Sequence, residues 1–342
     1  MWLAAVVERS QPLQGFRAPL LAMMVALFAS WLITPWVRRL AIERGAIDDP
    51  NQDARRVHKE PTPRWGGLAI YGGIVISLAA VLPFAYPYQP FPPYLLAMGG
   101  IGGLIVAMGA MDDLYQYSAK IQALFLLACG VGIQFFFDGQ RRVQIQGIVW
   151  PIFSDSGAWV PFGLWAIPLT AIYIFVVTKT MDTIDGVDGL ASGIAAIAGA
   201  TLAVIATYGE QPRVALVAAA IAGAAIGFLR HNYNPARIFM GTGGAQLLGF
   251  GLACLSIVGA LKTAAAVAIV VPVLVFGVQI FDAAFVVVRR ILSRQPITQA
   301  DKRHLHHTLM GLGLNTRQTV WVLYLAAVVL AGVLIVMVRM YA

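Results

Sequence analysis

Long apolar runs recur along almost the whole chain, and their length restricts the fold more than any other feature. Each run approaches the roughly 20 residues that a helix needs to cross the hydrocarbon core of a bilayer. A backbone inside a bilayer must bond its own polar groups, so these runs predict transmembrane α-helices. We expect an all-α, polytopic transmembrane bundle of about ten helices, with residues 1–342 as a single domain. The runs cover about residues 18–36, 67–86, 95–111, 121–137, 161–177, 190–207, 214–229, 243–261, 264–281 and 320–338.

The composition agrees with a membrane protein. Hydrophobic residues make up 59% of the 342 residues and charged residues only 12%, about half the charged share of a soluble domain. The two cysteines, Cys129 and Cys254, lie in apolar runs and have no metal-ligand spacing. We therefore expect two free thiols within the membrane.

Basic residues alternate between the connections and predict the orientation of the chain. The net charge is +8, and most Lys and Arg residues fall in every second connection. Such connections usually face the cytoplasm. We therefore expect a multi-pass membrane protein with both termini extracytoplasmic. On the extracytoplasmic side, the alternating sequence within 138–160 predicts a small hairpin.

Three aspartates follow one apolar run at steps of three: Asp182, Asp185 and Asp188. On a helix this spacing would place all three on one face near a membrane surface. Unpaired carboxylates there repel one another and lose hydration, so a cation or a cationic substrate group is expected among them. The alternative is a solvated loop in which Gly186 and Gly189 make turns.

Other acidic residues fall on the same predicted side. Asp112 and Asp113 end one apolar run, and Lys120 begins the next. This group could bind a cation and a phosphate, or it could be a helix cap with Lys120 as an interfacial anchor. Asp282 is a lone acid in an apolar stretch, which favours a functional role. Acids from several helix ends on one side predict a cytoplasmic-facing active site.

Histidines gather in one basic loop. His304, His306 and His307 follow Arg303. They could ligate zinc, but no second ligand pair completes such a site, so a grip on a phosphate or sugar is the better functional interpretation; a plain solvated loop is the alternative. Gly-rich residues 241–244 could cradle a phosphate or permit tight helix packing. Carboxylates, cations and histidines beside a membrane suit phosphoryl transfer between a nucleotide-linked substrate and a lipid.

Six motifs together resemble one known family, the polyprenyl-phosphate N-acetylhexosamine-1-phosphate transferases. They lie at 57–67 (Val-His, then Pro-Thr-Pro-Arg-Trp-Gly-Gly), 111–114 (Met-Asp-Asp-Leu), 184–190 (Ile-Asp-Gly-Val-Asp-Gly-Leu), 234–241 (Asn-Pro-Ala-Arg-Ile-Phe-Met-Gly), 281–282 (Phe-Asp) and 301–307 (Asp-Lys-Arg-His-Leu-His-His). The last motif is similar to the WecA/TagO branch, whereas MraY carries three consecutive histidines. The resemblance spans residues 55–313.

The resemblance implies a ten- or eleven-helix fold in the bacterial inner (plasma) membrane and a defined reaction. N-acetylglucosamine 1-phosphate would pass from UDP-N-acetylglucosamine to undecaprenyl phosphate, with release of UMP. The cofactor would be Mg²⁺, with Mn²⁺ a possible substitute. The lipid product would start a cell-envelope polysaccharide such as a teichoic acid or an O-antigen. No nucleic-acid partner is expected, and a homodimer is possible.

Competing interpretations remain at this stage. UDP-N-acetylmuramoyl-pentapeptide is the alternative donor. A membrane prenyltransferase would also use aspartates at helix ends, and an ion-coupled transporter would use intramembrane acids. The aspartates here lack the prenyltransferase spacing and cluster at one surface, which favours the sugar-phosphate transferase.

The resemblance and the charges together indicate the site residues. Asp282 would be the principal Mg²⁺ ligand, Asp112 would contact the lipid phosphate and Asp113 would support the metal site. The full set is Asp112, Asp113 and Asp185 as catalytic residues; Asp185 and Asp282 as metal ligands; and Arg64, Lys120, Lys179, Asp182, Asp188, Gly189, Leu190, Arg303, His304, His306 and His307 as substrate contacts.

Two departures from the family's usual pattern bear on the donor sugar. Lys179 and Asp182 stand where the family usually has asparagines, and their opposite charges predict a compensating ion pair. Thr242 stands where the family commonly has an acid, so the carboxylate count of the site is lower.

Overall fold

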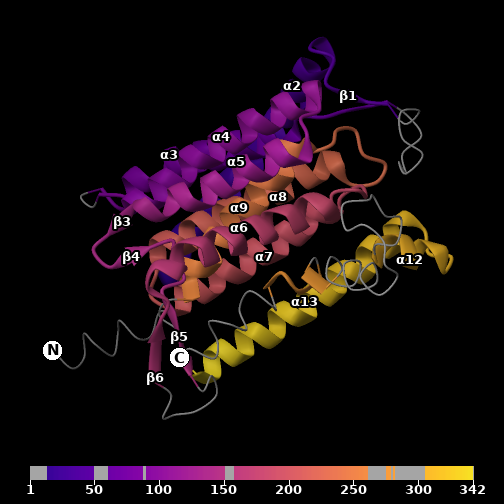
Figure 1. Ribbon diagram of the computed structural model, residues 1–342. Coiled ribbons are helices and arrows are strands. Elements are labelled where there is room, and N and C mark those ends of the chain that lie inside the picture. The colour runs from indigo at the N-terminus through magenta and orange to yellow at the C-terminus, as the bar shows by residue number, and fades with distance from the viewer. Residues whose placement is uncertain are drawn as a thin grey trace.

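The computed structural model describes residues 14–49, 61–87, 90–150, 158–260, 275–278, 280–281 and 305–341. Its helices run side by side as an elongated bundle (Figure 1). Eight helices within these ranges are long and apolar enough to cross a membrane, which confirms the all-α, multi-pass prediction. The eight spans correspond to α2 (Arg17–Glu43), α3 (Gly66–Ala85), α4 (Pro93–Tyr115), α6 (Ala166–Ile184), α7 (Leu190–Tyr208), α8 (Pro212–Asn232), α9 (Gly241–Ala260) and α13 (Thr316–Tyr341), and the shorter α5 covers Ala119–Gly132.

Shorter elements complete the described chain. The predicted run 121–137 forms α5 and a short 3-10 turn, η3 (Ile133–Phe135), and is shorter than the eight candidate spans. The predicted run 264–281 lies mostly outside the described residues. The other short helices are η1 (Gln14–Phe16), η4 (Gly163–Trp165) and α12 (Leu305–Gly311).

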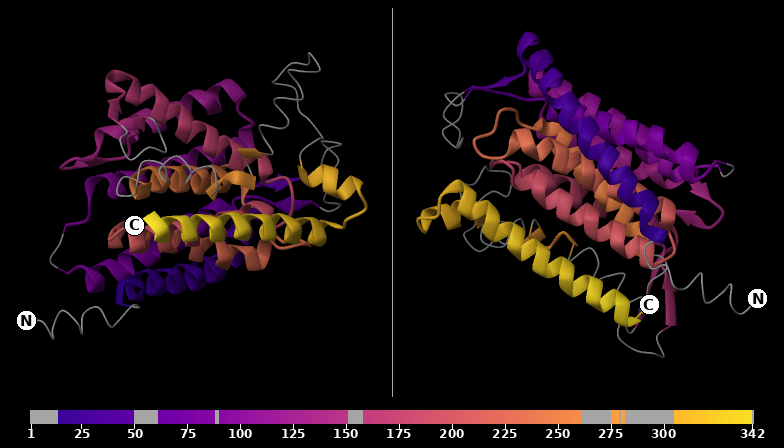
Figure 2. Two further views of the ribbon diagram at one scale, coloured as in Figure 1. Left: turned by 90° about the horizontal axis from the view of Figure 1, so that it is seen from below. Right: turned by 180° about the vertical axis from the view of Figure 1, so that it is seen from behind.

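The centre of the bundle consists of α7, α8 and α9. Helices α2 and α3 pack on α8, helices α4 and α6 pack on α9, and α13 packs along α7. Figure 2 shows α2 and α13 on the outside of the bundle. Small residues allow this proximity: a Cβ on Gly223 or Gly227 of α8 would overlap the backbone of α2 at Met23 or Leu27. Without a hydrophobic drive between helices in lipid, such small-residue contacts hold a bundle together.

Helix α2 continues beyond the predicted end at residue 36 and passes through Pro35. A proline has no N–H, so the carbonyl of Trp31 loses its helical partner. The Nε2 atom of His231 on α8 lies 3.1 Å from that carbonyl oxygen. This contact gives the Trp31 carbonyl a partner in place of the missing N–H. Helix α2 then continues to Glu43, shortly before β1 (Ile47–Asp48).

Three two-stranded antiparallel sheets lie at the ends of the bundle. Strand β1 (Ile47–Asp48) pairs with β2 (Thr62–Pro63) at one end. At the other end β3 (Phe137–Asp138) pairs with β4 (Arg141–Arg142), and β5 (Gly147–Trp150) pairs with β6 (Ala158–Pro161). The hairpin predicted within 138–160 is therefore confirmed.

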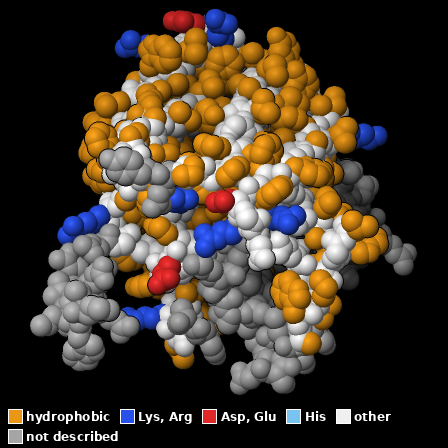
Figure 3. All heavy atoms as spheres, turned by 90° about the vertical axis from the view of Figure 1, so that its left-hand side faces the viewer, with side chains coloured by type: hydrophobic (Ala, Val, Ile, Leu, Met, Phe, Trp, Pro, Cys, Tyr) orange, Lys and Arg blue, Asp and Glu red, His pale blue; other side chains and the backbone are white. Residues whose placement is uncertain are grey.

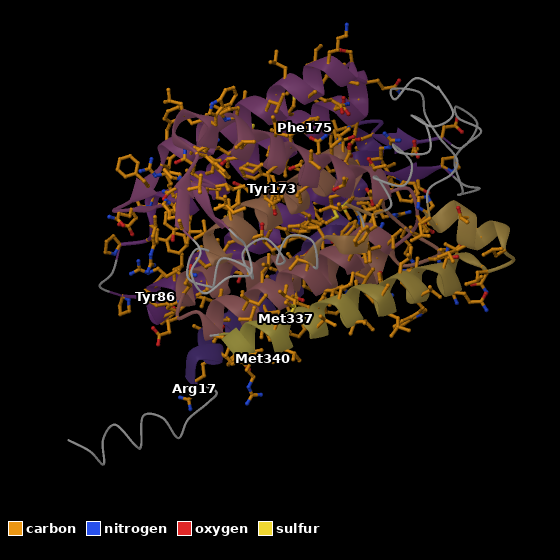
Figure 4. The ribbon with its side chains drawn as sticks, turned by 60° about the horizontal axis from the view of Figure 1, so that its bottom comes forward. Arg17, Tyr86, Tyr173, Phe175, Met337 and Met340 are labelled. Atoms are coloured by element: carbon orange, nitrogen blue, oxygen red, sulfur yellow. The ribbon has the colours of Figure 1, made fainter. Side chains whose placement is uncertain are left out.

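Both described chain ends lie at the end of the bundle that holds β3 to β6 (Figures 1 and 2). Arg17 and Tyr86 mark this end in Figure 4. Seen end-on in Figure 3, its described surface is largely hydrophobic, with scattered charged side chains. Cys129 and Cys254 are buried and unpaired, as predicted.

Candidate active site

Asp112 and Asp113 lie in the last turn of α4, at the end of the bundle opposite the chain termini. Asp112 is 7% exposed and the side chain of Asp113 only 1%. The carboxyl end of a helix dipole disfavours negative charge, and a buried carboxylate needs partners. Two buried acids at this position therefore depend on contacts from other helices.

Asp113 receives its partners from α9 and from the segment before α3. Its Oδ1 atom accepts hydrogen bonds from the Thr242 backbone N–H at 3.2 Å and the Thr242 Oγ1 hydroxyl at 3.1 Å. Arg64 Nη1 lies 3.5 Å from the same oxygen, and Arg64 also pairs with Asp48 of β1. The positive amino end of the α9 dipole thus faces Asp113. The second oxygen, Oδ2, is buried and has no hydrogen-bond partner among the described residues.

Glycines bring α3, α4 and α9 close enough for these contacts. A Cβ on Gly67 of α3 would overlap Gly244 of α9, and a Cβ on Gly109 of α4 would overlap Gly243. The N–H of Gly67 also donates to the carbonyl of Met240, just before α9, at 2.8 Å. Of the two functions expected for residues 241–244, the structure shows tight helix packing for Gly243 and Gly244.

Asp112 is held by a chain of polar contacts across α4, α5 and α6. Its Oδ1 atom accepts from the Tyr117 N–H and from the amide of Gln122, both at 2.9 Å. The oxygen of that amide accepts from Lys179 Nζ at 3.1 Å, and Lys179 pairs with Asp182 at 2.5 Å. The ion pair predicted for Lys179 and Asp182 is therefore confirmed. Gln122 was missed by sequence reasoning; its only signal is that it is polar near the start of an apolar helix.

The aspartates at steps of three do not share a helix face, so that prediction is wrong. Helix α6 ends at Ile184, and only Asp182 lies on it. Asp185 is the residue after the last helical position, and Asp188 lies in the turn before α7. The backbone leaves the helical conformation at Asp185, and the turn that follows ends at Gly189, whose φ of +80° a glycine adopts at no steric cost just before α7. The turn predicted from the glycines describes this segment better.

Asp185 lies in an unfavourable electrostatic environment. Burial raises the pKa of Asp185 well above its usual value, and the nearby carboxylates of Asp182 and Asp113 raise it further. The Arg64 guanidinium acts in the opposite direction. Within the described ranges Asp185 forms no hydrogen bond or ion pair. The described residues therefore compensate the charge of an ionised Asp185 poorly.

Asp188 binds protein groups in this structure. Its Oδ2 atom accepts from Asn234 Nδ2 at 2.9 Å and from the Ala236 N–H at 3.0 Å. These bonds fasten the turn between α6 and α7 to the connection between α8 and α9. The predicted donor-binding residue therefore also holds the loop that leads to Thr242.

Gly189 and Leu190 are fixed from two further helices. The Gly189 N–H donates to Asn232 Oδ1 at 3.1 Å, and the Tyr324 hydroxyl of α13 donates to the Gly189 carbonyl at 2.5 Å. Leu190 is 1% exposed and belongs to the core. Asn232 and Tyr324 were missed by sequence reasoning, because nothing in their local sequence separates them from packing residues.

The remaining predicted residues differ in position. Lys120 is exposed in the first turn of α5. His306 on α12 is buried, and a Cβ on Gly186 would lie 3.8 Å from its Nε2 atom, so α12 lies beside the Asp-Gly turn. His307 belongs to α12 but its side chain is not described. Three predicted residues lie outside the described residues: Asp282, Arg303 and His304.

The arrangement suits a cation with oxygen ligands. The described residues contain no ready cluster of three His, Cys, Asp or Glu side chains for a metal. They do contain the buried, unpartnered Oδ2 of Asp113 and the poorly compensated Asp185. Carboxylate oxygens are the ligands that Mg²⁺ and similar hard cations prefer. A cation beside these two groups would relieve both the unmet hydrogen-bonding capacity and the repulsion.

Comparison with known proteins decides the family. The model of glycosyl transferase family 4 matches residues 95–260. A probable undecaprenyl-phosphate N-acetylglucosaminyl 1-phosphate transferase of Bacillus subtilis (strain 168) is 37% identical over 304 residues, which cover 89% of this chain and 80% of that protein. The chain belongs to glycosyl transferase family 4. This family 4 protein also resembles a decaprenyl-phosphate N-acetylglucosaminephosphotransferase of Mycolicibacterium smegmatis, with 30% identity over 88% of this chain and 78% of that protein. An undecaprenyl-phosphate alpha-N-acetylglucosaminyl 1-phosphate transferase of Escherichia coli (strain K12) is 26% identical over 87% of this chain and 78% of that protein.

Family membership confirms the resemblance found in the motifs and makes this chain a membrane transferase. The matched residues 95–260 run from α4 to α9. They include Asp112, Asp113, Asp185 and Thr242, which the fold brings to one end of the bundle. Arg64 lies before the match yet reaches the same cluster through its ion pair with Asp113.

Proposed function

We propose that this family 4 protein transfers N-acetylglucosamine 1-phosphate from UDP-N-acetylglucosamine to undecaprenyl phosphate and releases UMP. One observation carries the proposal: buried carboxylates from α4 and from the turn after α6 meet Arg64 and the amino end of α9 at one end of a membrane bundle. The printed names of the relatives above support the sugar and the polyprenyl acceptor. The product would be the first lipid-linked intermediate of a cell-envelope polysaccharide.

The reaction forms one phosphorus–oxygen bond and breaks another. An oxygen of the lipid phosphate attacks the phosphorus that carries the sugar, and the bond from that phosphorus to the UMP oxygen breaks. A phosphate monoester has a second pKa of about 6 and is largely dianionic at neutral pH, so the nucleophile scarcely needs a general base. Positioning and charge neutralisation are then the main tasks of the protein.

We also propose Mg²⁺ as the cofactor, with Mn²⁺ as a substitute. Asp113, through its unpartnered Oδ2, and Asp185 would hold the ion together with Asp282. Bound Mg²⁺ would neutralise charge between the donor diphosphate and the acceptor phosphate, which otherwise repel each other. Thr242 and Arg64 hold Asp113 in place for this role from the protein side.

The other site residues have complementary tasks in this proposal. Asp112 orients the lipid phosphate, and the exposed Lys120 attracts phosphate at the membrane surface. Asp188 and Gly189 would line the site for the uracil, with Leu190 packed in the core behind them, and His306 approaches the same turn from α12. Arg303, His304, His306 and His307 would bind the sugar phosphate.

The distribution of charge supports a cytoplasmic active site. The helix ends that surround the site carry many basic residues, whereas the opposite end carries few. The positive-inside tendency therefore supports a site at the cytoplasmic side of the plasma membrane. The described basic residues of the site end are Arg38, Arg39, Arg44, Arg64, Lys120, Lys179, Arg230, Arg237 and Arg317.

The test measures UMP release by the purified protein in detergent with undecaprenyl phosphate and Mg²⁺. UDP-N-acetylglucosamine and UDP-N-acetylmuramoyl-pentapeptide are offered separately. Asp113→Asn and Asp282→Asn should abolish release, whereas Asp138→Asn, an exposed aspartate at the opposite end, should not. UMP from the first donor alone supports the proposal. UMP from the second donor alone would assign the protein to peptidoglycan synthesis, and no UMP release with either donor would refute the proposed reaction.

A further inference from the structure

Gln122 uses both ends of its side-chain amide. The Nε2 atom donates to Asp112 Oδ1 at 2.9 Å and lies 3.5 Å from the Tyr117 carbonyl oxygen. The Oε1 atom accepts from Lys179 Nζ at 3.1 Å. A single side chain near the start of α5 thereby connects an acid of α4 with a cation of α6.

The chemistry of the two neighbours allows only one orientation of this amide. A lysine ammonium can only donate, so it requires the amide oxygen. An ionised carboxylate can only accept, so it requires the amide NH₂. If the amide of Gln122 flipped, donor would meet donor at Lys179 and acceptor would meet acceptor at Asp112. Lys179, itself held by Asp182 at 2.5 Å, therefore fixes the direction in which Gln122 donates.

Both donors to Asp112 reach the same oxygen. The Tyr117 N–H and the Gln122 amide bind Oδ1 from two directions. These two hydrogen bonds to Oδ1 fix the side-chain torsion of the Asp112 carboxylate. That torsion determines the direction in which its other oxygen, Oδ2, points. The Tyr117 bond comes from the backbone just after α4, so Gln122 is the side chain that ties this rotation to α5 and α6.

We propose that Gln122 is a positioning residue for Asp112 and that Lys179 acts on the reaction through Gln122. The inference rests on the proposed sugar-phosphate transfer, in which Asp112 serves the acceptor phosphate. Its consequence is specific: damage to the chain of contacts affects the use of the lipid acceptor, while binding of the UDP-sugar stays intact.

The first test compares Gln122→Leu with a matched control, Gln134→Leu. Gln134 lies in η3, directly after α5, and its Nε2 atom donates to the Ile167 carbonyl of α6 at 3.0 Å, but at the opposite end of the bundle. Loss of a hydrogen bond to a charged group predicts at least about a tenfold fall in kcat/KM for undecaprenyl phosphate in Gln122→Leu. The KM for UDP-N-acetylglucosamine should stay at the wild-type value. Gln134→Leu should lower the melting temperature and leave both kinetic constants unchanged.

Two further variants separate positioning from simple helix bracing. Gln122→Glu keeps an acceptor for Lys179 but loses the donor to Asp112, so it should be as defective with the acceptor as Gln122→Leu. If Gln122 only braced α5 against α6, the ion pair between Glu at this position and Lys179 would preserve that function, and Gln122→Glu would stay active. Lys179→Met should lower activity alone and add little in the Gln122→Leu background, because coupled residues are not additive.

The outcomes distinguish the two proposals. An active wild type with an equally active Gln122→Leu or Gln122→Glu would overturn the positioning role of Gln122 alone. Fully additive losses in the double variant would overturn the action of Lys179 through Gln122. No UMP from the wild type would refute the proposed reaction, and this inference with it.

Discussion

Gly109→Ala should separate α4 from α9 and disconnect Asp113 from its donors. Gly109 lies one helical turn before Asp113, where α4 crosses the start of α9. A Cβ there would overlap the backbone N and Cα of Gly243 and lie 3.0 Å from the carbonyl carbon of Thr242. All of these atoms belong to backbone, so a change of rotamer cannot relieve the overlap. The helices would have to move apart by about 1 Å to restore carbon separations of about 3.5 Å.

That movement exceeds the tolerance of the hydrogen bonds at the site. Asp113 accepts from Thr242 at 3.2 and 3.1 Å, and an added 1 Å or so takes both beyond hydrogen-bond range. Overpacking costs about 1–3 kcal/mol, and each lost bond to a charged group about 1.5–3 kcal/mol. We therefore expect a loss of about 3 kcal/mol or more in the free energy of unfolding, and a fall in UMP release of at least about tenfold.

Gly100→Ala is the matched control on the same helix. Gly100 is exposed on α4, and a Cβ there would meet no atom within 4 Å. Helix propensity predicts a neutral or slightly stabilising effect, up to about 1 kcal/mol. Melting in one detergent and UMP release are measured for both variants. If Gly109→Ala melted and reacted like Gly100→Ala, close backbone packing would not position Asp113.

Three further predictions concern other contacts. Burial and nearby carboxylates raise the folded-state pKa of Asp185, so the protein is more stable when Asp185 is protonated and loses that stability as pH rises through this pKa. In EDTA, the melting temperature of Asp185→Asn should lack this part of the fall with pH. Identical curves of melting temperature against pH for the wild type and Asp185→Asn would contradict this prediction. Thr242→Val should reduce UMP release about tenfold because the hydroxyl bond to Asp113 is lost, whereas Thr242→Ser should not; equal rates would refute this. Tyr324→Phe loses the bond to the Gly189 carbonyl and should cost about 1 kcal/mol in unfolding free energy, measured by denaturation; unchanged stability would argue against it.

The spans could be predicted because the bilayer imposes a length on every apolar run, but their ends could not. Helix α2 was expected to stop at residue 36, yet it continues to Glu43. Hydropathy reports only the part within hydrocarbon, whereas the helix ends where its backbone bonds end. The tolerance of Pro35 depends on His231, which is distant in sequence and lies on another helix.

The acids of the site could be predicted, but their partners could not. A carboxylate next to an apolar run is conspicuous because its burial is costly. The groups that make burial acceptable are remote: Thr242 is 129 residues from Asp113, and Tyr324 is 135 residues from Gly189. The expected helix face of three aspartates failed for a local reason, since spacing alone does not show where a helix stops. Here the helix ends at Ile184, before Asp185.

The placement of Asp112 and Asp113 leaves their charge incompletely compensated by the described residues. Both acids occupy the carboxyl end of α4, where the helix dipole opposes their charge. The fold answers with the amino end of α9, Arg64 and the Gln122 amide, yet one oxygen of Asp113 remains buried without a partner among the described residues. Asp185 adds a further poorly compensated charge nearby. A fold that holds such groups in place is less stable than one without them, and a cation bound between them would recover that stability. Cation binding and folding stability should therefore be coupled at this end of the bundle.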